Sequence, residues 1–395
     1  MARIGTETAF EAAARARALE ASGRHVIHLE IGEPDFDTPR HISEAASRAL
    51  LDEGLTHYTS PTGIEPLRRA ICTEVRARKG IDATPEQVVV TPGAKPIMFY
   101  AMLAVVGEGD EVIYPNPGFP IYESMVAFVG GRPVAAPLRE ENDFRMDVDE
   151  VERLVTRRTR MIVINSPHNP CGSVLTAADV EAIARIAVEH DLVVLADEIY
   201  TRLQYDGEPV SIATLPGMAE RTITLDGFSK TYAMTGWRLG YGIVPEWLAT
   251  AFSRLVINSV SCTNAFAQAG AVEALTGPQD DADRMREEFV ARRALVVDGL
   301  NAIPGVGCVK PRGAFYAFPN VSSFGRSSAE LADHLLYDAG VCVLAGTAFG
   351  RHGEGYVRLS YANSRQNLSL AIERMATSLA RLERTGELVT AGSAR

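Results

Sequence analysis

A lysine, Lys230, is the residue best suited to covalent chemistry in this 395-residue sequence. An apolar run precedes it and predicts a buried strand, at whose end a lysine is costly unless it is paired or used covalently. A desolvated lysine has a lowered pKa and becomes a nucleophile suited to imine formation. Arg238 follows eight residues later and is suited to hold a phosphate through two parallel hydrogen bonds. Each residue taken alone is more readily interpreted as a solvent-facing side chain, so the interpretation depends on its context.

That context is a series of polar, Gly-rich or Pro-rich segments that follow apolar runs. From about residue 85 the chain alternates short β-branched runs with amphipathic stretches, which predicts an α/β fold whose parallel sheet is covered on both faces. In an open parallel sheet, ligands bind beyond the carboxyl ends of the strands. The segments at those ends are 91–95, 165–170, 197–200 and 229–230. Their clustering predicts one shared binding site.

The same periodicity predicts the individual elements. Strands are expected at 26–31, 88–90, 111–114, 160–165, 192–196 and 222–225. Helices are expected at 10–22, 96–106, 119–129, 177–190 and over a long stretch, 246–302, broken near Gly277-Pro278. The remainder, to about 382, mixes both types and is expected to form a smaller domain with the N-terminal segment. The polar tail from Thr385 to Arg395 is expected to fray.

Composition excludes several classes of function. The net charge of −11 opposes binding to nucleic acid and to anionic membranes, and no apolar run is long enough to span a bilayer. The five cysteines are scattered without a CxxC pair, and the eight histidines show no HExxH spacing, so no metal site is expected. The start of the chain lacks a signal-peptide pattern. We therefore expect a cytoplasmic protein with reduced thiols.

The segment Gly227–Gly240 resembles, at every specified position, the lysine-attachment motif of class I and II aminotransferases, which use pyridoxal phosphate (PLP). The resemblance runs from about Ile27 to Leu382 and is strongest to the bacterial aspartate aminotransferase branch. Its landmarks, in the family's order, are Gly-Glu-Pro-Asp-Phe at 32–36, Asn-Ser-Pro-His-Asn-Pro at 165–170, Asp-Glu-Ile-Tyr at 197–200 and Val-Arg-Leu-Ser at 357–360.

The resemblance implies fold type I, in which a large domain with a mostly parallel seven-stranded sheet flanked by helices carries a smaller α+β domain. The implied division is an N-terminal segment of the small domain (1–40), the large PLP-binding domain (41–290), the C-terminal small domain (291–384) and a flexible tail (385–395).

The resemblance also implies catalytic roles. Lys230 holds the cofactor as a Schiff base and, once displaced by substrate, moves the proton. Asp197 pairs with the pyridine nitrogen and keeps the ring protonated; the alternative for an aspartate there is a helix N-cap. Tyr200 and Asn169 bond the phenolic oxygen, and Asn169 also lies beside the substrate.

Further residues are implied to hold the cofactor's phosphate and ring. The phosphate meets the backbone N–H groups of Gly93, Ala94 and Lys95 at a helix start, together with Ser229 and Arg238. Tyr58 reaches the phosphate from the partner subunit, which predicts a homodimer with shared sites, and Phe119 stacks on the ring. The alternatives are an ordinary surface tyrosine and a core phenylalanine.

Substrate recognition is where the sequence departs from the family pattern. Arg358 is implied to bind the substrate α-carboxylate through a bidentate fork, with the Gly32 backbone open beside it. Phe119 stands where aspartate-specific enzymes usually carry tryptophan, and Asn258-Ser259 stands near the place of an arginine that reads acidic side chains. Lys95 either binds the acidic side chain of the substrate in place of that arginine or supplies only its backbone N–H group.

The expected function is transfer of an amino group from an L-amino acid, aspartate or similar, to a 2-oxo acid such as 2-oxoglutarate, in a ping-pong reaction through pyridoxamine phosphate. A PLP-dependent lyase or synthase is the alternative, because fold and cofactor do not fix the reaction. A cofactor-sensing regulator of transcription is a third possibility, opposed by the acidic charge and by ends too short for a DNA-binding module.

Overall fold

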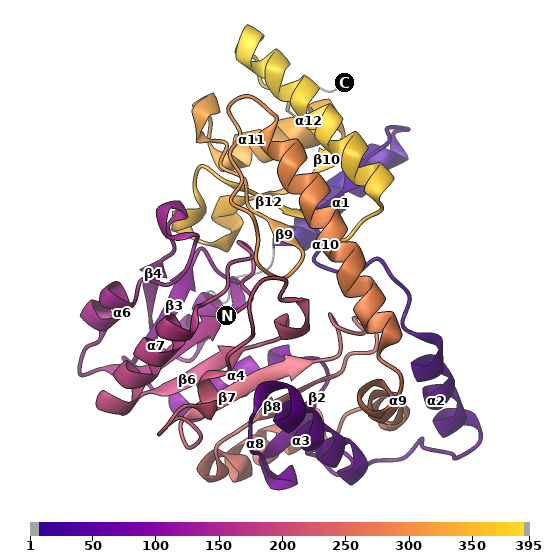
Figure 1. Cartoon of the computed structure of the whole chain (residues 1–395), viewed down its shortest axis with the longest axis vertical. Helices are drawn as coiled ribbons and strands as arrows, with labels where there is room; N and C mark the ends of the chain where they lie inside the picture. Colours follow the sequence, from indigo (N-terminus) through magenta and orange to yellow (C-terminus); the bar gives the residue numbers. More distant parts are fainter. Residues whose placement is uncertain (1–7, 391–395) are drawn as a thin grey trace.

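A computed structural model describes residues 8–390, and its centre is a seven-stranded sheet (Figure 1). The strand order is β2-β8-β7-β6-β5-β3-β4. β8 runs antiparallel to both of its neighbours and the other pairs are parallel. The strands are β2 (Val88–Thr91), β3 (Glu111–Asn116), β4 (Arg132–Pro137), β5 (Thr159–Asn165), β6 (Val193–Asp197), β7 (Thr222–Gly227) and β8 (Gly240–Ile243). The predicted mostly parallel α/β architecture is confirmed.

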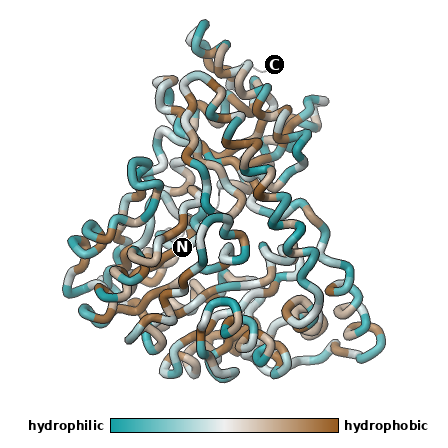
Figure 2. Tube along the Cα trace, viewed as in Figure 1, coloured by the Kyte–Doolittle hydropathy of each residue, from teal (hydrophilic) through white to brown (hydrophobic). Residues whose placement is uncertain are grey.

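Helices cover both faces of this sheet because its strands are apolar on both sides. Successive residues of β6 point to opposite faces. Leu195 packs in a cluster with Ile97 of α4, whereas Val194 packs with Ile183 of α7. Figure 2 shows the strands as a mainly hydrophobic trace inside the sheet region. The helices of this region are α2 (Arg40–Leu51), α3 (Glu65–Lys79), α4 (Lys95–Val105), α5 (Ile121–Phe128), α6 (Val148–Leu154), α7 (Ala177–Glu189), α8 (Glu246–Ser259) and α9 (Ala265–Thr276).

A second region lies above the sheet in Figure 1 and combines both ends of the described chain. β1 pairs in parallel with β10, and β12 lies between β11 and β9. The elements of this region are α1 (Thr8–Ala21), β1 (Ile27–His28), β9 (Tyr316–Ala317), α11 (Ser328–His334), β10 (Val341–Cys342), β11 (Leu344–Ala345), β12 (Val357–Ser360) and α12 (Arg365–Thr385). The long helix α10 (Asp280–Asn301) runs between the two regions.

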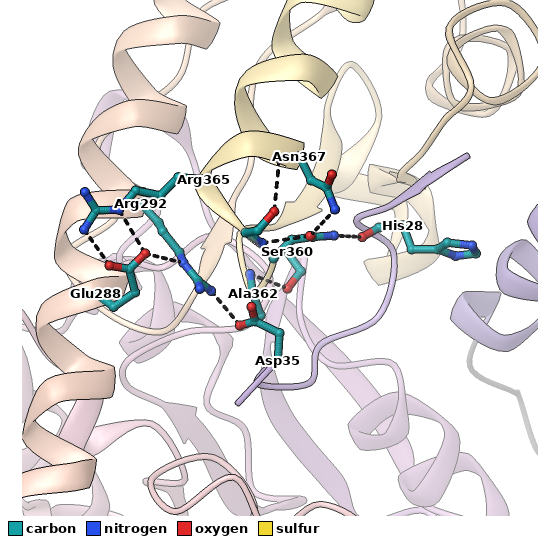
Figure 3. A network of polar contacts seen from close by, with 10 residues as sticks. His28, Asp35, Glu288, Arg292, Ser360, Ala362, Arg365 and Asn367 are labelled. Atoms are coloured by element: carbon teal, nitrogen blue, oxygen red, sulfur yellow. Dashed lines mark hydrogen bonds and ion pairs between the residues drawn. The ribbon is translucent and has the colours of Figure 1, made fainter. Parts of the chain in front are cut away.

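A polar network joins α10 to the N-terminal segment and to the start of α12 (Figure 3). The buried guanidinium of Arg292 bonds Asp35 at 2.5 Å and Glu288 at 2.9 Å. Glu288 also accepts a hydrogen bond from Arg365 Nε at 2.9 Å. Arg292 lies over the ring of Phe36, 4.8 Å from its centre. These contacts fix the chain that leads into the segment at Gly32.

Three details of the predicted elements were wrong. The stretch 246–302 has a second break at 260–264, since Asn264 caps α9 by accepting a hydrogen bond from Ala267 N. The strand predicted at 26–31 pairs only at Ile27 and His28, because its partner β10 is two residues long. Helix α12 continues to Thr385 and ends at Gly386 in a left-handed conformation. The last part of the predicted tail, 391–395, lies outside the described residues.

None of the helices in the described part of the chain is long and apolar enough to cross a membrane. Residues 8–390 contain no group of three or more histidine, cysteine, aspartate or glutamate side chains placed to hold a metal ion. All five cysteines are free thiols, three of them buried.

Candidate active site

A cavity of about 510 Å³ opens at the carboxyl ends of β5, β6 and β7. The sheet register places Asn165, Asp197 and Leu225 side by side at this edge, and all three line the cavity. Elements of the second region close its other side. The residues predicted from sequence that line it are Gly32, Ala94, Lys95, Phe119, Asn169, Asp197, Tyr200, Ser229, Lys230, Arg238 and Arg358.

The start of α4 lies at the cavity and is suited to bind an anion. Helix N-termini present free N–H groups and a positive dipole end. Gly93 has a φ of +84°, and a β-carbon there would lie 2.2 Å from Arg238 Nη2. The glycine therefore brings the guanidinium against the helix start, and Ser229 and Ala94 line the same cavity. Gly93 itself does not line the cavity but makes this approach sterically possible.

Lys230 lines the cavity three residues after the buried strand β7 ends. Its Nζ donates to the carbonyl oxygen of Gly32 at 2.5 Å. Burial lowers the pKa of Lys230 to about 8, an effect opposed by Glu33 and reinforced by Arg358 and other nearby cations. A fraction of this amine is neutral near physiological pH and able to act as a nucleophile.

Asp197, at the end of β6, is a buried carboxylate whose hydrogen bonds come from neutral groups. The Tyr122 hydroxyl donates to Oδ2 at 2.5 Å, and the Ile199 N–H donates to Oδ1 at 3.3 Å. Burial raises the pKa of Asp197 to about 6, although both hydrogen bonds lower it. Pairing this carboxylate with a cationic ligand would offset the cost of its burial.

Asn169 and Tyr200 lie on the wall beside Asp197. Asn165 Oδ1 accepts the Asn169 backbone N–H at 2.8 Å, which holds the loop after β5. The side-chain oxygen of Asn169 is buried without a hydrogen-bond partner within residues 8–390. Tyr200 shares a 2.7 Å hydrogen bond with the Tyr316 hydroxyl. A cavity wall with such polar groups is suited to a polar ligand.

Arg358, in β12, faces the cavity from the opposite side and is 3% exposed. Its guanidinium lies between two rings, 4.7 Å from the centre of Tyr316 and 5.0 Å from that of Phe349. It also donates to the backbone carbonyl of Glu30. An arginine buried between two rings at the wall of a cavity is suited to receive a carboxylate.

Phe119 and Lys95 line the remaining wall, with Lys95 Nζ lying 5.4 Å from the centre of the Phe119 ring. Tyr58 does not line the cavity, and its side chain is 89% exposed. Apart from Tyr58 and Gly93, all the sequence-predicted residues line this cavity.

Two tyrosines of the site are absent from the residues predicted from sequence to act in it. Tyr316 lines the cavity, and a β-carbon at Gly32 would lie 2.1 Å from its hydroxyl oxygen. Tyr122 gave no sequence signal beyond its place three residues after Phe119. Its partner, Asp197, is 75 residues away in the chain.

These residues fit PLP, whose parts differ in charge. The start of α4 with Arg238 suits the phosphate, and the neutral-bonded carboxylate of Asp197 suits a protonated pyridine. The side-chain amide of Asn169, whose oxygen has no hydrogen-bond partner within residues 8–390, suits a polar ring substituent. Lys230, with its lowered pKa, suits Schiff-base formation with an aldehyde.

Comparisons with known proteins agree with this fit. Residues 24–375 match the family described as aminotransferase class I and II. The chain is 46% identical to an aromatic-amino-acid aminotransferase of Thermococcus litoralis over 89% of this chain and 90% of that one. It is 45% identical to an aspartate aminotransferase of Pyrococcus abyssi over 90% and 92%.

A solved structure gives the same result. The aspartate aminotransferase of Rhizobium meliloti superimposes with a TM-score of 0.92 at 38% identity, covering 96% of this chain and 98% of that one. None of these relatives supports the lyase or synthase alternative. The chain therefore belongs to the class I and II aminotransferases, fold type I enzymes that move amino groups with PLP.

Proposed function

We propose that this aminotransferase moves the amino group of an L-amino acid, aspartate or a similar one, to a 2-oxo acid such as 2-oxoglutarate. The observation that carries the proposal is the convergence of Lys230, Asp197 and Arg358 on one cavity. These three supply a nucleophilic amine, an anion for the cofactor and a cation for a substrate carboxylate.

The bound cofactor supplies an electron sink that stabilises negative charge on the substrate α-carbon. Lys230 lines the cavity and moves the proton to and from that carbon, for which a pKa of about 8 is suited. Asp197 holds the pyridine nitrogen protonated. Arg358 binds the α-carboxylate, and the backbone of Gly32 is open to the same carboxylate. The Gly32 carbonyl oxygen accepts a hydrogen bond from Lys230 Nζ, which places this backbone at the reacting lysine.

Tyr200 and Asn169 are proposed to hold the phenolic oxygen of the cofactor. Asn169 also lies beside the substrate. Ser229 and Arg238, with the N–H groups of Gly93, Ala94 and Lys95, hold the phosphate.

The amino-acid specificity rests on the wall formed by Phe119 and Lys95. The relatives named above act, by their names, on aromatic amino acids and on aspartate, at nearly equal identity to this chain. Phe119 presents an apolar ring, and the Lys95 ammonium lies 5.4 Å from the centre of that ring. We propose that Lys95 reads an acidic side chain and that Phe119 stacks on the cofactor ring.

We further propose a cytoplasmic homodimer in which Tyr58 completes the partner's phosphate site. Its 89% exposure is compatible with this role, because an exposed side chain can be covered by a second chain. The domain division stays a proposal, with a large domain over 41–290 and a small one formed by 1–40 and 291–384. The boundary at 290 falls inside α10.

The test is to follow the near-visible absorbance of the PLP-loaded protein while single L-amino acids are added. A true donor should remove the band, and 2-oxoglutarate should restore it. Lys230→Ala should show neither change, since the group that forms the Schiff base is gone. Release of ammonia with no recovery by 2-oxoglutarate would contradict the proposal.

Lys95→Ala provides the specificity test. If Lys95 reads acidic side chains, kcat/KM for aspartate should fall by roughly tenfold to a hundredfold, the range for a hydrogen bond to a charged group. The rate with an aromatic donor should change little. Equal losses for both donors would instead assign Lys95 to the cofactor site.

A further inference from the structure

Tyr122 is a buried residue that contacts two cofactor-site residues at once. It lies in the first turn of α5 and is fully buried. Its hydroxyl donates to Asp197 Oδ2 at 2.5 Å. Its ring meets that of Phe119 edge to face, with 5.8 Å between centres and 80° between planes. Its backbone N–H donates to the Phe119 carbonyl at 3.1 Å.

The direction of approach matters for its role. Asp197 and Phe119 both line the cavity, whereas Tyr122 does not. The tyrosine therefore contacts both residues from the protein side and leaves their cavity sides open to a ligand. A short phenol–carboxylate hydrogen bond is charge-assisted, so it favours the ionised form of the acid and fixes its orientation.

The surroundings of Asp197 explain why such a donor is needed. Burial opposes ionisation of this carboxylate, and the nearby carboxylates of Asp226 and Glu198 oppose it further. The two hydrogen bonds, from Tyr122 and from the Ile199 N–H, act in the opposite direction. The Ile199 bond is the longer one, at 3.3 Å. Of the two donors, the Tyr122 hydroxyl is therefore the one that chiefly stabilises the ionised form of Asp197.

We propose that Tyr122 is a positioning residue of the cofactor site, which orients the Asp197 carboxylate toward the pyridine nitrogen and braces the Phe119 ring against the cofactor face. The proposal rests on the role proposed above for Asp197. The orienting role is distinct from core packing because it needs the hydroxyl, whereas the contact with Phe119 would be kept by any ring of the same size.

Tyr122→Phe tests this, since it removes the hydroxyl and keeps the ring. Tyr361→Phe is the matched control: Tyr361 is also fully buried, and its hydroxyl donates to the Ala314 carbonyl at 3.0 Å. Asp197→Asn is the reference for the carboxylate. For all three, the dissociation constant of PLP and the pH midpoint of the near-visible absorbance are measured, together with the melting temperature of the cofactor-free protein.

The expected result is graded. PLP affinity of Tyr122→Phe falls by roughly tenfold to a hundredfold, as for loss of a hydrogen bond to a charged group. Its absorbance midpoint moves in the same direction as in Asp197→Asn and by a smaller amount. Tyr361→Phe lowers the melting temperature without moving either cofactor readout.

Two other results have different meanings. If Asp197→Asn changes affinity and midpoint while Tyr122→Phe behaves like Tyr361→Phe, the positioning role is wrong and the role of Asp197 stands. If Asp197→Asn itself leaves both cofactor readouts unchanged, the role proposed for Asp197 fails, and the positioning role fails with it.

Discussion

Two buried lysines at the same edge of the sheet have opposite surroundings. Lys79, at the end of α3, contacts Glu198 at 2.8 Å and Asp226 at 2.6 Å. Lys230, on the cavity side, contacts the neutral carbonyl of Gly32. Burial by itself lowers the pKa of both amines, but the two carboxylates outweigh it at Lys79 and raise its pKa above the ordinary value. At Lys230 burial prevails, and the pKa falls to about 8.

The carboxylates repeat this contrast. Glu198 and Asp226 have an ammonium between them, and Glu198 also accepts the Ser211 hydroxyl at 2.6 Å. Asp197 is adjacent to Glu198 in the chain but has only neutral donors. Buried charges are tolerated when they are paired, so the paired cluster serves the fold. On the cavity side, Asp197 and Lys230 have neutral hydrogen-bond partners among the described residues, and they are the groups whose charged partners a ligand would supply.

Removing the cation of the paired cluster should have the largest effect on stability. Lys79→Met leaves two buried carboxylates close together without compensation, which should lower the free energy of unfolding by about 3–5 kcal/mol. Urea unfolding of the cofactor-free protein measures this. Arg76→Met is the control on the same helix, because Arg76 pairs with Asp82 at the exposed surface. There the loss should stay within about 1 kcal/mol. Equal effects would show that Lys79 is not a structural cation.

Asp197→Asn, on the cavity side, should keep the stability of the fold and lower the activity. The variant keeps the shape of the side chain and removes a buried charge, so the cofactor-free protein should be at least as stable as the wild type. The cofactor loses its anionic partner, and kcat/KM should fall by roughly 10²- to 10³-fold, the scale of a broken buried ion pair. Single-turnover kinetics and unfolding measure the two effects. A variant that is unstable but active would contradict the contrast between the two clusters.

The sequence predicted the residues that line the cavity much better than the ion-paired cluster of Lys79, Glu198 and Asp226. Gly32, Lys230, Asp197 and Arg358 were found because their segments match a known series of motifs and each follows or lies in an apolar run. Asp197 ends β6 and Lys230 follows the end of β7. These two strands are parallel neighbours in the sheet, so the convergence of the two residues followed from the topology.

Lys79 and Tyr122 were missed because their partners are distant in the chain. Lys79 lies 119 residues from Glu198 and 147 from Asp226. In sequence it is the last residue of a charged amphipathic helix, where a lysine is ordinarily solvated or interacts with the helix dipole. Tyr122 reads as one more aromatic in an apolar helix. Only packing of α3 and α5 against the sheet gives these two residues their partners.

The pH dependence of stability should differ between wild type and Asp197→Asn. Burial raises the pKa of Asp197 in the cofactor-free fold from its ordinary 3.8 to about 6. A raised pKa means that the folded state holds this proton more tightly than the unfolded state. The stabilisation is therefore complete below about pH 3.8 and is lost as the pH rises to about 6. Its size is roughly 3 kcal/mol, from two pH units at 1.36 kcal/mol each.

The measurement is urea unfolding of both cofactor-free proteins between pH 4 and 7. The Asn variant should gain stability relative to wild type as the pH rises, while other titrating groups cancel in the difference. Adding PLP should remove the wild-type loss, because the ligand supplies a cation for the ionised acid. A difference independent of pH would mean that Asp197 is ionised and well compensated without the cofactor.

Arg358→Lys should give the smallest effect on activity. It tests the part of the cavity that is proposed to bind the substrate carboxylate. Arg358 lies between the rings of Tyr316 and Phe349 and donates to the Glu30 carbonyl, which hold its guanidinium at the cavity. Lysine keeps the charge and loses the planar fork, so one of two hydrogen bonds to the substrate carboxylate is lost. The resulting fall in kcat/KM should be roughly tenfold to a hundredfold, chiefly through KM. PLP affinity should be unchanged, because the cofactor contacts lie on the opposite wall. A fall in PLP affinity with normal KM would place Arg358 among the groups that hold the cofactor, and the cavity would then need another cation for the substrate.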